Sequence, residues 1–181
     1  MVGTREVLHD VVAVDRAVYA AVAGTETPAL DVGMRRLSAA ADHSKISLTV
    51  AGLLALRGGR SRRAALLGTV AIGVASTVAN LVAKQLVRRP RPDRAGSRSS
   101  PERHVPMPVS ASFPSGHTAA AVAFAVAVGS ELPAAATPLG VLAVAVGYSR
   151  VHSGVHYPGD VVAGVVIGVA SAATVSAVTR H

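Results

Sequence analysis

The sequence predicts an all-α protein: an integral-membrane helical bundle of about five spans, with interfacial helices at its N-terminus. Three observations favour this class. Half of the 181 residues are hydrophobic, yet the formal net charge is +8, so apolar and basic residues must be segregated. The apolar residues are mostly Ala, Val, Leu and Gly, whose small side chains let helices pack closely in lipid. Uncharged runs long enough to cross a bilayer alternate with basic or Pro-rich segments.

The N-terminal part of the chain has the pattern of helices that lie along a membrane surface. Residues 2–42 are apolar positions broken every few residues by charge, which is typical of interfacial helices. Pro28 is suited to the first turn of a helix, and apolar residues at helical spacing follow it up to Ala41. Residues 46–56 are uncharged but fewer than the ~20 that span a bilayer, so this first span depends on its flanks. We therefore expect a single membrane-embedded domain, with interfacial helices in residues 1–43 and a transmembrane core in residues 44–181.

Four further spans follow, at residues 64–83, 115–130, 132–149 and 161–178. The first of them is preceded by arginines that we interpret as a basic loop, residues 57–63. Pro90 and Pro92 end the helix that contains Lys84, because proline has no N–H and disfavours helical geometry in the residue before it. With five crossings, residues 84–113 and 149–160 fall on the same side of the membrane.

Three motifs lie on that side: K-x6-RP (Lys84, Arg91, Pro92), PSGH (residues 114–117) and SR-x5-H-x3-D (Ser149, Arg150, His156, Asp160). The first motif alone is weak, because basic residues are ordinary at the ends of spans. Average residue frequencies make a chance PSGH run an event of order ~10⁻³ in a chain of this length. The occurrence of all three motifs at one surface indicates a real site.

Five motif residues are suited to binding a phosphoryl group. Lys84, Arg91 and Arg150 donate hydrogen bonds and accept none, and the planar guanidinium of arginine matches phosphate oxygens. Ser115 and Gly116 lie where a loop becomes a helix, so we expect their backbone N–H groups to point at the same anion.

Two histidines are the candidates for covalent and proton-transfer steps, because imidazole changes charge near neutral pH. Asp160, four residues after His156, is placed to accept a hydrogen bond from one ring nitrogen and leave the other free to attack phosphorus. His156 is therefore the predicted nucleophile, and His117 the acid that protonates the leaving oxygen and then the base that activates water. Cations around the phosphoryl oxygens stabilise the developing charge, so we expect no metal ion and no cofactor.

The charge and the absence of cysteine limit the partners. Zero cysteines exclude disulfides and thiolate chemistry. A basic chain is also typical of nucleic-acid-binding proteins, but here the basic residues crowd the ends of apolar runs, where they suit anionic headgroups. We expect the lipid bilayer and a membrane lipid phosphate as partners, and no nucleic acid. The sequence does not indicate an oligomeric state.

At these motifs the sequence resembles the type 2 phosphatidic acid phosphatase (PAP2) family, whose three-part signature is present in full from Lys84 to Asp160. The resemblance implies a helical bundle that hydrolyses phosphomonoesters or pyrophosphates without a metal, through a phosphohistidine intermediate. By motif position it implies the same roles for the eight residues named above. Within the family, the short chain, the interfacial N-terminus and the Arg-rich first motif are most similar to those of the small bacterial polyprenyl-lipid phosphatases.

This resemblance implies a polyprenyl-linked phosphate, such as decaprenylphosphoryl-5-phosphoribose, as the substrate and a role in cell wall biosynthesis. Undecaprenyl pyrophosphate, phosphatidylglycerophosphate and phosphatidate are alternatives, and the sequence does not separate monophosphates from pyrophosphates. A function of another class is a non-catalytic membrane module that binds anionic lipid through its basic face. The intact second and third motifs argue against it.

The distribution of charge predicts the orientation of this multi-pass protein in the cell membrane. Of the 18 Lys and Arg residues, five fall on the side opposite the motifs: Arg57, Arg60, Arg62, Arg63 and Arg180. The other thirteen, or ten without the three that we expect to bind phosphate, fall on the motif side. The positive-inside rule then places the site on the cytoplasmic face.

Overall fold

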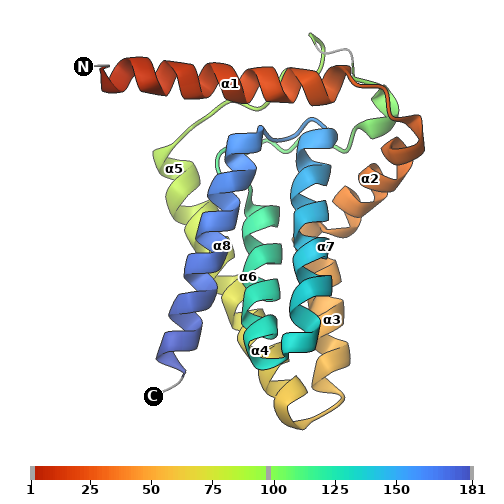
Figure 1. Ribbon diagram of the computed structural model, residues 1–181, viewed down its shortest axis with the longest axis vertical. Coiled ribbons are helices and arrows are strands. Elements are labelled where there is room, and N and C mark those ends of the chain that lie inside the picture. The colour runs from red at the N-terminus through yellow and green to blue at the C-terminus, as the bar shows by residue number, and fades with distance from the viewer. Residues whose placement is uncertain (1–2, 97–98, 180–181) are drawn as a thin grey trace.

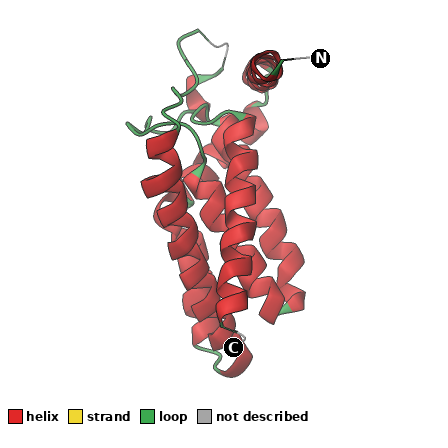
Figure 2. Cartoon of the chain, turned by 90° about the vertical axis from the view of Figure 1, so that its left-hand side faces the viewer, coloured by secondary structure: helices red, strands yellow, loops and turns green. Residues whose placement is uncertain are grey.

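The regular secondary structure of the described residues is all helical, without a strand, and a long loop joins the helix that ends at Leu86 to the one that begins at Gly116 (Figures 1 and 2). The computed structural model describes residues 3–96 and 99–179, except for the side chains of Thr4, Arg5 and Leu8. Three of the cations counted above are thus outside the description: Arg98, Arg180 and the side chain of Arg5.

Most helices run along the axis of one bundle. They are α3 (Lys45–Ala55), α4 (Gly59–Thr77), a π-helical segment (Val78–Ala83) that continues α4 into α5 (Lys84–Leu86), α6 (Gly116–Glu131), α7 (Pro133–His152) and α8 (Pro158–Val178). Helix α6 is central and packs against α4, α7 and α8. Its buried residues are mostly alanines, because only small side chains allow neighbours on several sides to approach so closely.

Within residues 3–96 and 99–179, three helices are long and apolar enough to cross a membrane: Gly59–Leu86, Pro133–His152 and Pro158–Val178. Helices α3 and α6 run beside them but are shorter, at 11 and 16 residues. As the sequence predicts, the chain alternates direction, so that α5 and α7 end, and α6 and α8 begin, at the same end of the bundle (Figure 1). The loops that carry the motifs therefore meet there.

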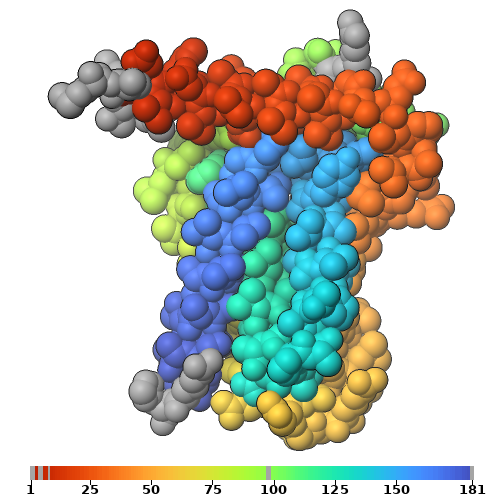
Figure 3. All heavy atoms as spheres, in the orientation of Figure 1, coloured from red at the N-terminus to blue at the C-terminus, as the bar shows by residue number. Residues whose placement is uncertain are grey.

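The two N-terminal helices pack around this end. Helix α1 (Thr4–Gly24) lies across it, covers the tops of α7 and α8 in the space-filling view, and is seen end-on in the rotated view (Figures 2 and 3). Tyr19 and Ala23 are the buried contacts of α1 with Val151 of α7. Helix α2 (Pro28–Ala40) begins at the predicted proline and packs against α7. The position of both helices at a membrane surface stays a prediction.

Three predicted boundaries differ from the structure, and one of them is the end of α7, which continues three residues past Ser149 to His152. The arginines of residues 57–63 do not all lie in a loop, because the connection after α3 is only residues 56–58 and α4 begins at Gly59. Gly58 and Gly59 have φ of +70° and +50°. Arginine is a good helix former, so the basic residues after the turn join the first turns of α4. Helix α8 also begins three residues earlier than predicted, because Pro158 is favoured in the first turn.

Close packing of α8 on α6 fixes the start of α8. A Cβ atom at Gly164 would lie 2.6 Å from the carbonyl oxygen of Ser115, and one at Gly168 would lie 2.6 Å from that of Ala119. Only glycine allows this approach, as the Gly-x3-Gly spacing predicts. The first turn of α8, which contains Asp160, is thereby held against the first turn of α6.

Candidate active site

A cavity of about 430 Å³ opens at the motif-bearing end of the bundle. Its wall contains residues of all three motifs: Lys84, Arg91, Gly116, His117, Arg150 and His156. The structure therefore brings together six of the eight predicted site residues around one space. The other two, Ser115 and Asp160, lie behind this wall and are fully buried.

The π-helical segment before Lys84 sets the direction of the lysine side chain. Its Nζ donates to Asn80 Oδ1 at 2.8 Å and to Ser110 Oγ at 3.3 Å. From the sequence, Asn80, one turn before Lys84, is equally compatible with orienting the lysine and with helix packing, and the structure contains the hydrogen bond to Lys84. A π-helical turn shifts the residues after it around the helix, which is a common feature of functional sites. Here it places the ammonium group on the wall of the cavity.

Arg91 holds the loop before α6 and faces the predicted nucleophile. Its Nε and Nη2 donate to the carbonyl oxygens of Ser110 and Ala111, at 2.9 and 3.2 Å, and its Nη1 donates to Val155 O at 2.6 Å. The same Nη1 is 3.4 Å from His156 Nε2. Burial lowers the pKa of Arg91, whereas the charge of Asp160 raises it. One guanidinium thus joins the first motif to the third.

Arg150 is buried, with only 2% of its surface exposed, and is held by a residue outside the three motifs. Its Nη1 donates to Ser38 Oγ at 2.7 Å and to Ser38 O at 3.2 Å. Its Nε makes no hydrogen bond with any residue of the described ranges. A buried arginine with an unused donor on the wall of a cavity is suited to bind an anion there.

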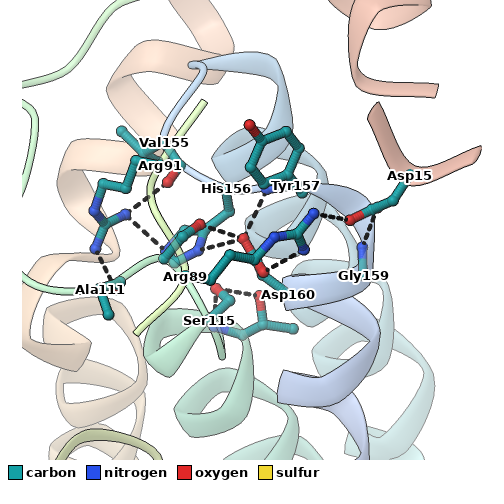
Figure 4. Close-up of polar contacts among 12 residues, drawn as sticks. Asp15, Arg89, Arg91, Ala111, Ser115, Val155, His156, Tyr157, Gly159 and Asp160 are labelled. Carbon is teal, nitrogen blue, oxygen red and sulfur yellow. Dashed lines mark hydrogen bonds and ion pairs between the residues drawn. The ribbon is translucent and has the colours of Figure 1, made fainter. Parts of the chain in front are cut away.

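His156 and Asp160 form a buried pair with a defined orientation (Figure 4). A guanidinium only donates hydrogen bonds, so the His156 Nε2 that faces Arg91 carries the lone pair and the ring proton is on Nδ1. This Nδ1 lies 3.4 Å from Asp160 Oδ2, longer than a typical hydrogen bond. The backbone N–H of Tyr157, at 2.8 Å, and the Ser112 hydroxyl also donate to Oδ2. The lone pair therefore points towards the cavity and the carboxylate lies behind the ring.

The environment of His156 keeps its ring neutral. Burial, the largest cause, lowers its pKa from 6.5 to about 4, and the charges of Arg91 and Arg150 act in the same direction. The nearby carboxylate of Asp160 raises the pKa but does not offset the burial. A neutral imidazole with a lone pair is the nucleophilic form of histidine.

The loop-to-helix junction before α6 differs in part from the expectation. The backbone N–H of Ser115 donates to Asp160 O at 2.9 Å, and its side chain caps α6 by accepting from Thr118. The N–H of Ser115 is thus not directed at the cavity, and the residue joins the second motif to the third instead. Gly116 does line the cavity, and a Cβ there would lie 3.2 Å from Asn80 Oδ1.

His117 contacts a carboxylate that the sequence motifs do not include. Its Nε2 is 2.7 Å from Asp42 Oδ1, and Arg150 Nη1 is 3.6 Å from the same oxygen. Asp42 lies in the short turn between α2 and α3, where the next two residues, His43 and Ser44, have φ of 55° and 57°. All three residues of this turn line the cavity. The break between α2 and α3 thus forms part of the site.

Other residues that support the site also lie outside the predicted set. Arg89 binds Asp160 Oδ1 at 2.9 Å. Its only signal in the sequence is its position two residues before Arg91 in the first motif. His152 has no partner at metal-ligand spacing in the sequence, which predicts an interfacial or loop residue, but it is buried in α7 and lies 3.0 Å from Asp31 Oδ1. Asp31 also binds Arg103, so that α2, α7 and the loop before α6 are joined.

Comparison with known proteins identifies the family. The PAP2 superfamily profile matches residues 64–181. Decaprenylphosphoryl-5-phosphoribose phosphatase of Mycobacterium tuberculosis is 37% identical over 171 residues, which cover 92% of this chain and 89% of that protein. The protein of the same name from Mycolicibacterium smegmatis is 39% identical over 154 residues, covering 82% of this chain and 77% of that protein.

Two crystal structures share the fold. The transmembrane PAP2-type phosphatidylglycerolphosphate phosphatase from Bacillus subtilis matches with a TM-score of 0.74 at 26% identity, covering 94% of this chain and 87% of that one. LpxE of Aquifex aeolicus matches with a TM-score of 0.73 at 22% identity, covering 88% and 92%. These matches confirm the family resemblance of the motifs and the all-α membrane fold. The chain therefore belongs to the PAP2 superfamily and is a membrane phosphatase of that family.

Proposed function

We propose that this enzyme removes the terminal phosphate of a polyprenyl-linked phosphosugar, with decaprenylphosphoryl-5-phosphoribose as the first candidate. The observation that carries the chemistry is the orientation of His156, whose Nε2 lone pair faces Arg91 and the cavity while Asp160 lies behind the ring. The observation that carries the substrate is the 37–39% identity to two phosphatases named for that lipid.

The reaction begins with attack of His156 Nε2 on phosphorus. The bond from phosphorus to the ester oxygen breaks, and His117 donates a proton to that leaving oxygen, which becomes a hydroxyl group of the sugar. Lys84, Arg91, Arg150 and the backbone of Gly116 stabilise the charge on the phosphoryl oxygens. The product of this step is phosphohistidine, whose ring Asp160 orients.

Hydrolysis of the phosphohistidine completes the cycle. His117, now neutral, takes a proton from a water molecule in the cavity as the water attacks phosphorus. The bond from nitrogen to phosphorus breaks, inorganic phosphate is released and His156 returns to its starting form. The catalytic groups are His156 and His117, and the cations replace the charge neutralisation that a metal ion supplies in other phosphatases.

The polar wall of the cavity supports a headgroup with hydroxyl groups. The cavity is larger than one phosphate, and its wall includes the side chains of Asp42, Ser44, Ser76 and Ser110. A carboxylate accepts hydrogen bonds from ribose hydroxyls but repels a phosphate attached directly to the reacting one. This favours a terminal phosphate carried on a sugar over the terminal phosphate of a lipid pyrophosphate.

The first experiment compares His156→Ala with His9→Ala in purified, detergent-solubilised enzyme. His9 is an exposed residue of α1 that does not line the cavity, so its substitution is the matched control. We expect His156→Ala to abolish phosphate release and the formation of an acid-labile phosphoprotein from ³²P-labelled substrate, while a cooperative thermal unfolding transition shows that the variant is still folded. Full activity of His156→Ala would refute the mechanism.

The second experiment tests the substrate. Phosphate release is measured with decaprenylphosphoryl-5-phosphoribose, undecaprenyl pyrophosphate, phosphatidylglycerophosphate and phosphatidate at matched surface concentration. We expect kcat/KM to be highest for the phosphoribosyl lipid. A higher value for either glycerolipid or for the pyrophosphate would refute this assignment while leaving the mechanism in place.

We also propose that the site faces the cytoplasm, on the basis of the excess of Lys and Arg on the motif side. The chain contains no cysteine, so single cysteines can report the orientation. Ala95→Cys marks the exposed loop at the catalytic end, and Arg60→Cys marks the exposed start of α4 at the opposite end. In intact cells, a membrane-impermeant maleimide should label Arg60→Cys only. Labelling of Ala95→Cys instead would reverse the orientation.

A further inference from the structure

Arg89 lies between the catalytic carboxylate and the helix that crosses the end of the bundle (Figure 4). Its Nη1 donates to Asp160 Oδ1 at 2.9 Å, and its Nη2 is 2.6 Å from Asp15 Oδ2 of α1. Both carboxylates are buried, at 0% and 9% exposure of their side chains, and the Arg89 side chain is only 18% exposed. The guanidinium also lies over the Tyr157 ring, 4.0 Å from its centroid.

The contacts of Asp160 show what Arg89 controls. One carboxylate oxygen, Oδ2, accepts from Tyr157 N–H and Ser112 and faces His156 Nδ1. The other oxygen, Oδ1, accepts from Arg89. A charged hydrogen bond to Oδ1 fixes the rotation of the carboxylate, because any turn that moves Oδ2 away from the imidazole also breaks it. Arg89 does not line the cavity, so it acts on the reaction through Asp160 and not through the substrate.

Asp15 holds Arg89 in place and belongs to a different part of the chain. Its Oδ1 accepts from the backbone N–H of Gly159 at 2.7 Å, in the first turn of α8. A Cβ at Gly159 would lie 3.0 Å from Asp15 Oδ2, which shows how closely α1 approaches α8 here. Each oxygen of Asp15 therefore has a separate partner, and the carboxylate cannot follow Arg89 away from Asp160.

We propose that Arg89 is a positioning residue for the His156–Asp160 pair and that Asp15 is its anchor, so that α1 takes part in catalysis. This inference rests on the proposed role of His156 as the nucleophile. The same contacts would also arise in an ion pair that only stabilises the fold. The two roles differ in one measurable respect: a positioning residue loses its effect on turnover when the group that it positions is removed.

The test is a double-mutant cycle on turnover. Arg89→Gln is made in the wild-type enzyme and in the Asp160→Asn variant, and kcat, KM and vanadate affinity are measured for each. We expect Arg89→Gln to lower kcat by about 10- to 100-fold, the usual effect of removing a partner behind a reacting ligand. KM and vanadate affinity should change by less than about threefold, because Arg89 does not reach the cavity. In the Asp160→Asn background, the further loss of kcat should be under about threefold.

The matched control is Arg88→Gln. Arg88 is exposed, is adjacent in sequence and forms no ion pair with a residue of the described ranges. We expect its activity to equal that of the wild type, which separates a local effect from loss of one positive charge. If Arg89→Gln does not fold, Arg89→Lys keeps the charge but lacks the planar fork that bridges two carboxylates. Arg89→Lys should also lower kcat, but by less than Arg89→Gln.

Asp15→Asn tests the contribution of α1. We expect it to lower kcat with the same unchanged KM and to add little in the Arg89→Gln background. Asp10→Asn is its control, because Asp10 is an exposed residue of the same helix.

Three outcomes would overturn the proposal: full activity of Arg89→Gln, an equal fold-loss with and without Asp160, or a loss that appears mainly in KM. The His156→Ala experiment tests the proposed function separately, so these three outcomes can be told apart from a failure of that function.

Discussion

The acid side of the pH–rate profile tests whether the buried His156 is the nucleophile. Burial lowers the pKa of His156 to about 4, against an ordinary value of 6.5. At pH 5.5 a histidine with a pKa of 4 is ~97% neutral, whereas one with a pKa of 6.5 is only ~9% neutral. The fraction of nucleophilic enzyme at that pH therefore differs about tenfold between the two cases. We expect nucleophilic attack to persist at pH 5.5 and to be half-maximal near pH 4.

The same shift predicts the pH dependence of stability. Between pH 4 and 6.5 the unfolded chain binds a proton at this residue and the folded protein does not, so stability falls as the pH is lowered through this window. A shift of this size corresponds to about 3 kcal/mol in full, at about 1.4 kcal/mol per pH unit. Above pH 6.5 the residue adds no pH dependence. His156→Gln should remove this part of the slope.

The assay uses an aryl phosphate whose leaving group needs no proton, so that His117 does not contribute to the first step. The rate of phosphoenzyme formation is measured by rapid quench from pH 4.5 to 8 and divided by the ionised fraction of substrate, obtained by ³¹P NMR. Thermal unfolding of wild type and His156→Gln is followed over the same range. A fall in the corrected rate centred at pH 6 to 6.5 would refute the reasoning, since it would show a solvated histidine.

Three further predictions concern the packing, the chemistry and the phosphate site. Gly164→Ala places a methyl group 2.6 Å from a backbone oxygen and should destabilise the fold by about 1–3 kcal/mol. Gly140→Ala is the control, because its methyl group would meet no atom within 4 Å. Equal thermal unfolding temperatures of the two variants would contradict the close packing. Activity should survive dialysis against EDTA, and vanadate, which resembles the five-coordinate transition state, should inhibit competitively; loss of activity that zinc or magnesium restores would contradict the metal-free mechanism. Asn80→Leu removes the acceptor of Lys84 Nζ and should raise KM by about tenfold with a smaller change in kcat, and an unchanged KM would show that the lysine needs no support.

The sequence predicts the bundle and the meeting of the motifs because both follow from local signals. Uncharged runs mark helices that must avoid water, and alternate crossings then place the loops around Lys84 and His156 at one end. The exact helix starts are less predictable. A basic run before an apolar one is compatible with either a loop or the first turns of a helix, and only the positive φ angles at Gly58 and Gly59 decide it.

The support that the site receives from the N-terminal helices is not predictable from the sequence. Ser38 and Arg150 are 112 residues apart, and Asp42 and His117 are 75 apart. No periodicity or motif spacing connects them, because they meet only through the packing of α2 against α7 and of the turn at residues 42–44 against α6. The π-helical segment is equally hidden, because the sequence of residues 78–83 is that of an ordinary apolar helix. The motifs predict the residues that react with the phosphoryl group or bind it, but not the residues of the N-terminal helices that hold them in place.

The break between α2 and α3 has a consequence for the supply of water. Two successive residues, His43 and Ser44, leave the helical conformation at the level of the cavity. Inside a bilayer, backbone groups released by such a break are tolerated only where protein or water satisfies them. We therefore expect this part of the wall to stay hydrated when a lipid fills the entrance, so that water remains beside the phosphohistidine that it cleaves.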